Sequence, residues 1–394
     1  MTATAADPRL CALCPKLCRF ACPVADGTAD EGATPTAMLQ AAGDARAGRI
    51  PWSEAAETLE KCTGCEACRA PCEFDQDVPA LLYAARAEAF AAGEAAPGAE
   101  ALHAVHLEHG NPFGRDLHAA LRAHAKEDRD FDRKGRVLFW PSCRMLAERP
   151  EQAAAAMDLF RDLGGDHMSL PARSEIPCCG APLQVVGDQP GLEVAAASLQ
   201  QYFNRQRTWV TPSSRCLLTV RNGYQAIDQD IRAEVLHAAE YMLFFKEALG
   251  DRGKAAMDGF EARDEPVPTV VVHDACGLHR RVGAGAAVHE VVEALTGSAP
   301  ASLDGYPDRS ACCGAGDFHD LRRPEAAAAV GASSAAGRDV KPGTWIVTGD
   351  SDCVGALRAA HPDARVEDIL GFAIAWTRPR PGTAPTASGG SPAA

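Results

Sequence analysis

The sixteen cysteines of this 394-residue chain are the residues whose type and spacing most clearly indicate chemistry. Structural disulfides are rare in the cytoplasm, the compartment expected for this chain, so this number favours metal binding or redox chemistry. Alternatively, the cysteines would be small core residues scattered without a pattern. This is disfavoured, because four groups of regular spacing account for all sixteen cysteines. The groups are Cys11, Cys14, Cys18 and Cys22; Cys62, Cys65, Cys68 and Cys72; Cys143, Cys178, Cys179 and Cys216; and Cys276, Cys312, Cys313 and Cys353.

The second group has the spacing Cys-x2-Cys-x2-Cys-x3-Cys, in which three thiolates hold one iron–sulfur cluster and the fourth binds its neighbour. The first group has one extra residue between its second and third cysteines and ends in Cys-Pro. Zinc is the competing occupant of four-thiolate sites, but it seldom occurs in two crossing sets of this spacing. We therefore predict two [4Fe-4S] clusters, one held by Cys11, Cys14, Cys18 and Cys72 and the other by Cys62, Cys65, Cys68 and Cys22.

Glu73 stands where a proline usually follows the last cysteine of this motif. A carboxylate about 6 Å from a cluster, at an effective dielectric constant near 20, favours the oxidised state by at most about 3 kcal/mol, or on the order of 100 mV for one electron. Exposure of the side chain would reduce the effect. We predict that the cluster bound by Cys72 has the lower potential of the two.

The last two groups of cysteines indicate an internal repeat. Cys143, the pair Cys178/Cys179 and Cys216 recur 133, 134 and 137 residues later. A vicinal pair followed by glycine suits a turn that aims two sulfurs at one metal, because adjacent cysteines do not easily close an ordinary disulfide with each other. His273 and Asp274 stand just before Cys276, where they would hydrogen-bond a cluster sulfur, move a proton or serve only as structural residues.

The same order of elements recurs around the two sets of cysteines. An apolar run predicts a strand that ends on the first cysteine, and helix-like segments and a second strand follow. Strands that alternate with helices predict mainly parallel sheets, with all the cysteines in loops at strand ends. The expected strands lie in 136–143, 208–216, 269–276 and 344–353, and the expected helices in 150–165, 192–207, 285–297 and 324–338.

The N-terminal part of the chain has a different pattern, which predicts helices around its cysteines. Thr34 and Ser53 are expected N-caps, and Val78-Pro79 is expected to start a third helix. The predicted fold is therefore a helical ferredoxin-like head followed by two repeated α/β units. The expected divisions are the head (1–92), a helical linker (93–134), unit 1 (135–250), unit 2 (265–376) and a disordered tail (377–394) rich in Pro, Gly, Ser and Ala.

Composition excludes several classes of partner. With 39 Lys and Arg against 53 Asp and Glu, the formal net charge is −14, which disfavours binding to nucleic acid and to anionic lipid. The sequence has no apolar run long enough to cross a membrane and no signal peptide at its start. We expect a cytoplasmic protein that reaches the inner membrane only through its partners.

The two CCG segments, IPCCGAP and SACCGAGD, together with HDACGLHRR, resemble the CCG-domain proteins related to heterodisulfide reductase. The resemblance covers almost the whole chain and is closest to the iron–sulfur subunits of glycolate and lactate oxidation and of anaerobic glycerol-3-phosphate dehydrogenase. It implies a further cluster in each unit, held by Cys143, Cys178, Cys179 and Cys216 and by Cys276, Cys312, Cys313 and Cys353. It also implies electron transfer from a flavoprotein dehydrogenase, or an electron-transfer flavoprotein, toward a membrane quinone-reducing subunit. The sequence has no flavin or nicotinamide fingerprint of its own.

Both units depart from the family pattern at its closing Cys-x-x-Cys, which reads Ser213 to Cys216 in unit 1 and Asp350 to Cys353 in unit 2. The missing fifth cysteine disfavours the noncubane cluster with which some members of this family cleave disulfides. Asp350 is a candidate oxygen ligand, whereas Ser213 is a poorer one. Alternatively, both residues cap the helix that begins near the last cysteine.

Three functions follow from these observations. The first is an electron-transfer subunit without catalysis of its own. The second is a catalytic subunit, similar to heterodisulfide reductase, with an open iron site near Asp350 or Ser213. The third is a scaffold in which the two units bind zinc. Iron–sulfur clusters transfer single electrons and do not oxidise C–H bonds, so the first function requires a separate flavin subunit to take a hydride.

Overall fold

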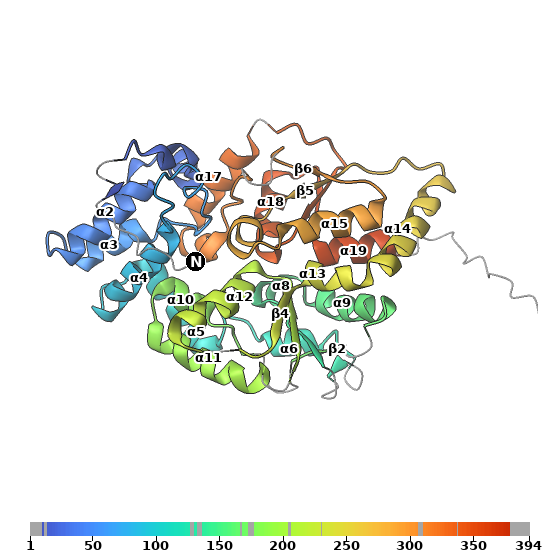
Figure 1. The fold of residues 1–394 in the computed structure, drawn as a ribbon, viewed down its shortest axis with the longest axis horizontal. Helices are drawn as coiled ribbons and strands as arrows, with labels where there is room; N and C mark the ends of the chain where they lie inside the picture. Colours follow the sequence, from blue (N-terminus) through green and yellow to red (C-terminus); the bar gives the residue numbers. More distant parts are fainter. Residues whose placement is uncertain are drawn as a thin grey trace, which may run out of the picture.

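The chain folds into a helical head beside two α/β units, as seen in the computed structural model (Figure 1). The head lies at the left of the view, with unit 1 below and unit 2 above. The structure describes residues 10–11, 14–126, 130–131, 136–165, 168–171, 177–203, 206–229, 231–305, 310–336 and 338–378. The predicted disordered tail lies outside the described residues from 379 onward, and Thr377 ends the last helix.

Every regular element in the described part of the head is helical. Thr34 caps the second α-helix through its hydroxyl, which accepts a hydrogen bond from the Ala37 amide, so this predicted cap is confirmed. The prediction that Ser53 is the N-cap of the next helix is wrong. Helix α3 starts at Trp52, and the Ser53 amide donates instead to the carboxylate of Glu94 at 2.8 Å, a cap supplied from 41 residues away. The elements are η2 (Leu17–Ala21), α1 (Pro23–Thr28), η3 (Glu31–Ala33), α2 (Pro35–Arg46), α3 (Trp52–Leu59) and α4 (Val78–Ala91), the last of which starts at Val78 as predicted.

The linker is helical and packs on unit 1. It contains α5 (Pro97–His109) and α6 (Leu117–Arg122). The ring of His103 in α5 lies 2.9 Å from the carboxylate of Asp188 in unit 1, which fixes the linker to that unit.

Each unit contains a four-stranded sheet whose described pairings are all parallel, as predicted. The strand order is β2-β1-β3-β4 in unit 1 and β6-β5-β7-β8 in unit 2. The central pairings share one register, because Leu138 opposite Trp209 corresponds to Val271 opposite Ile346 in the repeat. The strands are β1 (Val137–Phe139), β2 (Met168–Ser169), β3 (Thr208–Thr211), β4 (Glu234–His237), β5 (Val270–His273), β6 (Ala301–Ser302), β7 (Trp345–Thr348) and β8 (Arg365–Asp368).

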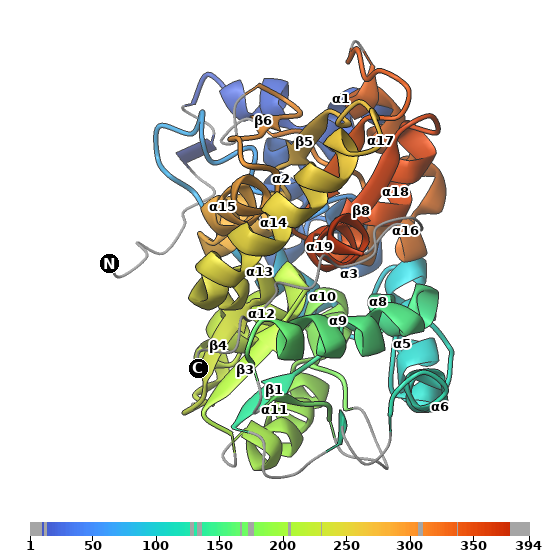
Figure 2. The ribbon, with the colours of Figure 1, turned by 90° about the vertical axis from the view of Figure 1, so that its right-hand side faces the viewer.

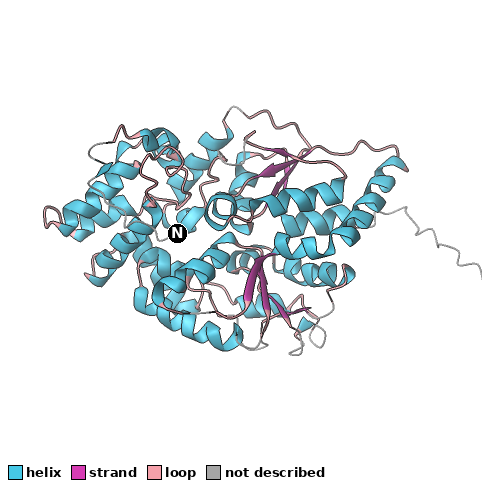
Figure 3. Cartoon of the chain, in the orientation of Figure 1, coloured by secondary structure: helices cyan, strands magenta, loops and turns pink. Residues whose placement is uncertain are grey.

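Helices dominate the rest of both units (Figure 3). Those of unit 1 are α8 (Cys143–Glu148), α9 (Pro150–Asp162), α10 (Ala181–Val186), α11 (Gln189–Phe203), α12 (Ser214–Leu218), η4 (Thr219–Gly223), η5 (Gln225–Ile227), α13 (Ala238–Met242), η6 (Leu243–Phe245) and α14 (Lys246–Glu261), which leads toward unit 2. Those of unit 2 are η7 (Gly277–Val282), α15 (Gly285–Thr296), η9 (Gly316–Phe318), α16 (His319–Arg322), α17 (Pro324–Ala335), η10 (Ser351–Cys353), α18 (Val354–Ala360) and α19 (Ile369–Thr377).

The two units pack face to face through α9 and α13 of unit 1 against α15 and α19 of unit 2 (Figure 2). One apolar core runs through both units. Its largest side chains include Trp140 and Trp209 in unit 1 and Trp376 in unit 2, each almost fully buried. Burial of such side chains is the main favourable contribution to the stability of this core.

In each unit the first and last cysteines follow the carboxyl ends of the two central strands, and the vicinal pair comes after an edge strand. In the order β2-β1-β3-β4, the chain leaves β1 and β3 in opposite directions, and open α/β sheets place their sites at such a switch point. One detail of the prediction is wrong: Cys143, Cys216 and Cys353 lie within short helical segments rather than in loops. The reason is that the residues before them, Ser142 among them, cap those segments directly after each strand.

Among the described residues, no helix is long and apolar enough to span a membrane.

Candidate metal centres

The eight cysteines of the head lie in two neighbouring groups. Burial raises the pKa of Cys11, and the nearby thiols of Cys18, Cys72 and Cys14 raise it further. The other four cysteines, Cys22, Cys62, Cys65 and Cys68, line one small cavity together with Pro23 and Met38. A cavity walled by four thiols and apolar side chains fits an iron–sulfur cluster, and the ligand assignment itself stays a prediction.

The loop around Cys62 and Cys65 is fixed by the backbone and by unit 2. Gly64 adopts a φ of +67° and donates its amide to the Cys62 sulfur at 3.3 Å. Arg280 of unit 2 donates from Nε to the carbonyl oxygen of Cys65 at 2.7 Å. The buried Glu66, which also has a positive φ, accepts from Arg281 at 3.1 Å. Contacts with unit 2 therefore hold the second cysteine loop of the head in place.

The four cysteines of unit 1 lie together. The thiols of Cys179 and Cys216 are 3.3 Å apart, and Cys178 hydrogen-bonds both Cys143 and Cys179. All four line a second small cavity. Gly180, at a φ of +80°, makes the turn that aims the vicinal pair, because a residue with a β-carbon would be strained there and would contact Leu192. This set of donors also fits an iron–sulfur cluster.

Ser213 caps the helix that contains Cys216. Its hydroxyl accepts a hydrogen bond from the Cys216 amide at 3.4 Å, while its own amide donates to the Thr211 hydroxyl. The capping alternative for Ser213 is thus confirmed.

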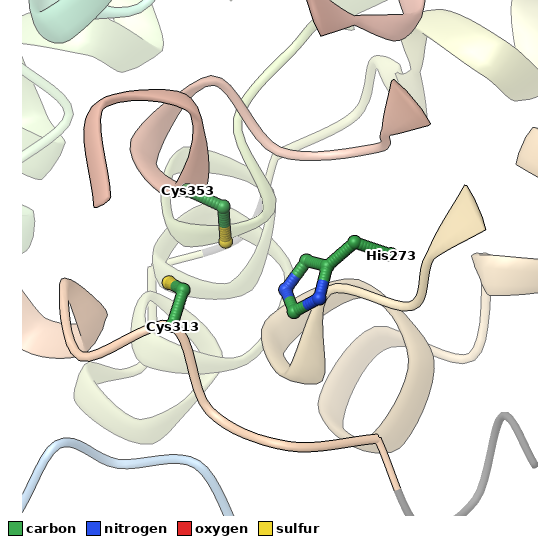
Figure 4. Close-up of side chains that lie close together, drawn as sticks. All are labelled: His273, Cys313 and Cys353. Carbon is green, nitrogen blue, oxygen red and sulfur yellow. The ribbon is translucent and has the colours of Figure 1, made fainter. Parts of the chain in front are cut away.

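The four cysteines of unit 2 form two pairs. Cys312 hydrogen-bonds Cys276, and also Cys65 of the head. Cys313 instead pairs with Cys353, and these two thiols lie beside His273 (Figure 4). The neighbouring Cys353 thiol and His273 imidazole hold the pKa of Cys313 well below its usual value, which favours the thiolate that binds metals.

Asp350 lies between the two units. One carboxylate oxygen accepts from the Asp352 amide at 3.1 Å, and the other accepts from the Ser214 hydroxyl of unit 1. Burial raises the pKa of Asp350 to about 7, and the neighbouring Asp352 contributes to the rise. The capping alternative for Asp350 is confirmed. The role of Asp350 as a metal ligand stays a prediction.

The units face each other with approximate two-fold symmetry beside the cysteines. The Ser142 hydroxyl of unit 1 lies 2.9 Å from that of Ser351 in unit 2. Ser214, the repeat counterpart of Ser351, lies close against Gly277, where a β-carbon would overlap the serine hydroxyl. These contacts bring the cysteine sites of the two units toward one another.

Asp317 joins all three parts of the molecule. Its carboxylate pairs with Arg215 of unit 1 and Arg281 of unit 2 and accepts from the Tyr83 hydroxyl of the head at 2.7 Å. Burial alone would raise the pKa of Asp317, but Arg215, Arg281 and Arg86 lower it to about 2. This junction was not predicted from the sequence. Its only local signal is the charged residue beside each cysteine motif, as in Ser-Arg-Cys and Cys-Cys-Gly-Ala-Gly-Asp.

Comparison with known families gives one finding for these sites. Residues 137–221 and 270–358 each match the family model of the CCG cysteine-rich domain. The two matches cover the cysteines of unit 1 and unit 2. A search of the curated proteins gave no match to the chain.

Proposed function

Because the chain contains two CCG cysteine-rich domains, we propose that it is an iron–sulfur electron-transfer subunit of an oxidoreductase complex. The proposal assigns two [4Fe-4S] clusters to the ferredoxin-like head and one further iron–sulfur cluster to each unit. Bound in these sites, the clusters would supply one-electron transfer.

The observation that supports this function best is the contact between Cys65 of the head and Cys312 of unit 2. The two thiols hydrogen-bond each other, and the Cys312 sulfur lies 3.7 Å from the Thr63 hydroxyl. Cys22, Cys65, Cys276 and Cys312 belong to one buried cluster with Val24 and Val330. Electron transfer slows steeply with distance, so ligands in contact are suited to rapid exchange between the head and unit 2.

The contacts suggest one linear order for the sites. The cysteine set that includes Cys11 and Cys18 adjoins the set that includes Cys68. The evidence is that the Cys18 thiol is close enough to raise the pKa of Cys68. Cys65 then contacts unit 2. Unit 2 meets unit 1 through Asp350 and Ser214. In this proposal electrons enter at one end of the series and leave at the other.

The proposed partners follow from what the series lacks. A flavoprotein dehydrogenase of the 2-hydroxyacid or glycerol-3-phosphate type, or an electron-transfer flavoprotein, would take a hydride from a metabolite and deliver single electrons. A quinone-reducing membrane subunit, or another acceptor, would receive them.

Metal analysis of anaerobically purified protein tests the proposal. Four [4Fe-4S] clusters would give about sixteen irons per chain, whereas clusters in the head alone would give about eight. A count near eight, with zinc in the two units, would establish the scaffold alternative instead. A change in the electron paramagnetic resonance (EPR) signal of either unit on adding a heterodisulfide would favour the catalytic alternative.

A pair of matched variants tests the order of the sites. Two reduced clusters with adjoining ligands should split each other's EPR signals. Cys312→Ser should remove the splitting of a head signal, whereas Cys178→Ser, the equivalent change in unit 1, should leave it intact. Equal effects of the two variants would contradict the proposed order.

A further inference from the structure

The imidazole of His273 points at two cysteines of unit 2 (Figure 4). The ligand atoms of His273, Cys313 and Cys353 all lie within 4.8 Å of one another. Each of the three residues is at least nine-tenths buried, and His273 is 1% exposed. One buried nitrogen donor thus lies within reach of two buried thiols.

Three different elements bring these side chains together. His273 is the last residue of β5 and pairs in register with Thr348 at the end of the adjacent strand β7. Cys353 follows β7 in η10. Cys313 precedes Gly314, whose φ is +94° and where a β-carbon would overlap the Ala327 carbonyl oxygen, so the turn that aims Cys313 is tightly fixed. The arrangement is built into the backbone of the unit.

Hydrogen bonds to the described residues do not explain the position of the histidine ring. Among the described residues, neither ring nitrogen has a hydrogen-bond partner. Leaving a buried imidazole without partners is costly, and buried polar groups are almost always satisfied. The side chains that it faces are thiols, which together with imidazole are common metal ligands.

Unit 1 has no nitrogen donor at the position that corresponds to His273. The repeat places Trp140 where unit 2 has His273, and the indole packs edge-on against Trp209 at a centroid distance of 5.8 Å. An indole N–H is a donor only and cannot bind a metal through a lone pair. The two units therefore differ at this position in the donors that they offer, although their cysteines correspond.

We propose that His273 is a nitrogen ligand of the metal centre that Cys313 and Cys353 hold in unit 2, which gives this centre mixed sulfur and nitrogen ligation. The inference rests on the proposed function and concerns one site within it. Cys312 lies beside Cys276 and Cys65 of the head, so in this proposal His273 replaces one thiolate of the Cys276 and Cys312 pair as a ligand. A neutral imidazole in place of that anionic thiolate reduces the negative charge around the iron and favours the reduced state. Unit 2 then has the higher midpoint potential of the two CCG centres.

The direct test is pulsed EPR of the full-length reduced protein labelled with 15N-histidine. The signal of unit 2 is the one that Cys313→Ser abolishes. It should show a strong coupling to one 15N nucleus, as a coordinated nitrogen gives. A unit 2 signal without such coupling would overturn the inference while leaving the proposed function intact.

Two variants with opposite expectations accompany this measurement. His273→Cys should keep the iron content, lose the nitrogen coupling and lower the midpoint potential of unit 2. The matched control is His289→Gln in the same unit, which removes a histidine that bonds Asp274 at 2.7 Å and should leave the coupling unchanged. Coupling that persists in His273→Cys would show that His273 is not the ligand.

The failure of the proposed function would be recognised separately. If iron counting finds none in unit 2 but zinc is present, the iron–sulfur role of this unit is wrong. X-ray absorption at the zinc edge then decides the ligand: a nitrogen neighbour that His273→Cys removes supports the inference, and a shell of sulfur alone overturns it.

Discussion

The α-carbon of Gly64 in the head lies directly against the carboxylate of Asp317 in unit 2, so that a β-carbon at position 64 would overlap both carboxylate oxygens. Gly64 also has a φ of +67°, which residues with a β-carbon adopt at a cost. One glycine therefore permits both the turn between Cys62 and Cys65 and the close approach of unit 2.

Replacing Gly64 should destabilise the docked head. We expect Gly64→Ala to cost about 1–2 kcal/mol for the left-handed backbone and about 1–3 kcal/mol more for the clash, because three arginines hold Asp317 in place. Gly48→Ala is a matched control, since Gly48 has the same φ of +67° and no atom within 4 Å of its added β-carbon. Thermal unfolding of the two variants checks the prediction. Equal melting temperatures would show that the contact with Asp317 does not matter.

Removing the charge of Asp317 should weaken the junction strongly. Asp317→Asn leaves Arg215, Arg281 and Arg86 without their shared buried counter-charge, and breaking a buried pair typically costs about 3–5 kcal/mol. The comparison is Asp75→Asn, because Asp75 pairs with Arg69 in an exposed position where ion pairs contribute little to stability. Chemical denaturation should separate the two variants clearly. Similar losses would show that the three arginines find other partners.

Glu73 provides a test of the predicted order of potentials in the head. Its side chain is exposed, so an effective dielectric constant near that of water applies. At about 6 Å from the cluster, the carboxylate charge then lowers the reduction potential by roughly 30 mV. Glu73→Gln should raise the potential of the cluster bound by Cys72 by about this amount and leave the other cluster unchanged. Potentiometric EPR titration measures both values, and two unchanged potentials would refute the prediction.

His237 should make the stability of the units depend on pH. Burial lowers the pKa of His237 to about 4, and its Nδ1 accepts a hydrogen bond from the Ala239 amide. As the pH falls, His237 is protonated in the unfolded chain at a higher pH than in the folded protein. The contribution of the neutral His237 to the free energy of unfolding is therefore complete above about pH 6.5 and is lost as the pH falls toward 4. Between pH 7.5 and pH 5 the free energy of unfolding decreases by about 2 kcal/mol through this group.

The variant His237→Asn keeps a capping side chain but does not titrate. Its melting temperature should therefore fall less than that of the wild type between pH 7.5 and pH 5. A decrease of the same size in both proteins would assign the pH dependence to other groups.

The sequence was most informative where the pattern is local. The apolar runs before Cys143 and Cys276 predicted β1 and β5, and the recurring intervals between cysteines predicted the repeat. The edge strands β2 and β6 have two residues each, too few for any periodicity. The cap of α3 was missed because Glu94 supplies it from another part of the chain.

The candidate sites also combine features that local sequence predicts with features that depend on packing. Cysteine spacing was enough to propose the sets in the head, whose members the structure brings together. Spacing could not indicate that Cys65 meets Cys312, or that Asp317 meets Arg215, because these contacts depend on how three separately folded parts pack. His273 stood out in the sequence, but its direction toward Cys313 and Cys353 required the registry of β5 and β7.

The covalent connection of the two units through α14 has a consequence for how their sites can differ. In a pair assembled from two copies of one polypeptide, any residue exchanged in one partner appears in the other as well. Here each half is encoded separately, so Trp140 and His273, or Ser213 and Asp350, occupy corresponding places without constraint from each other. The duplicated architecture can therefore specialise one member of the pair while its counterpart stays as it was.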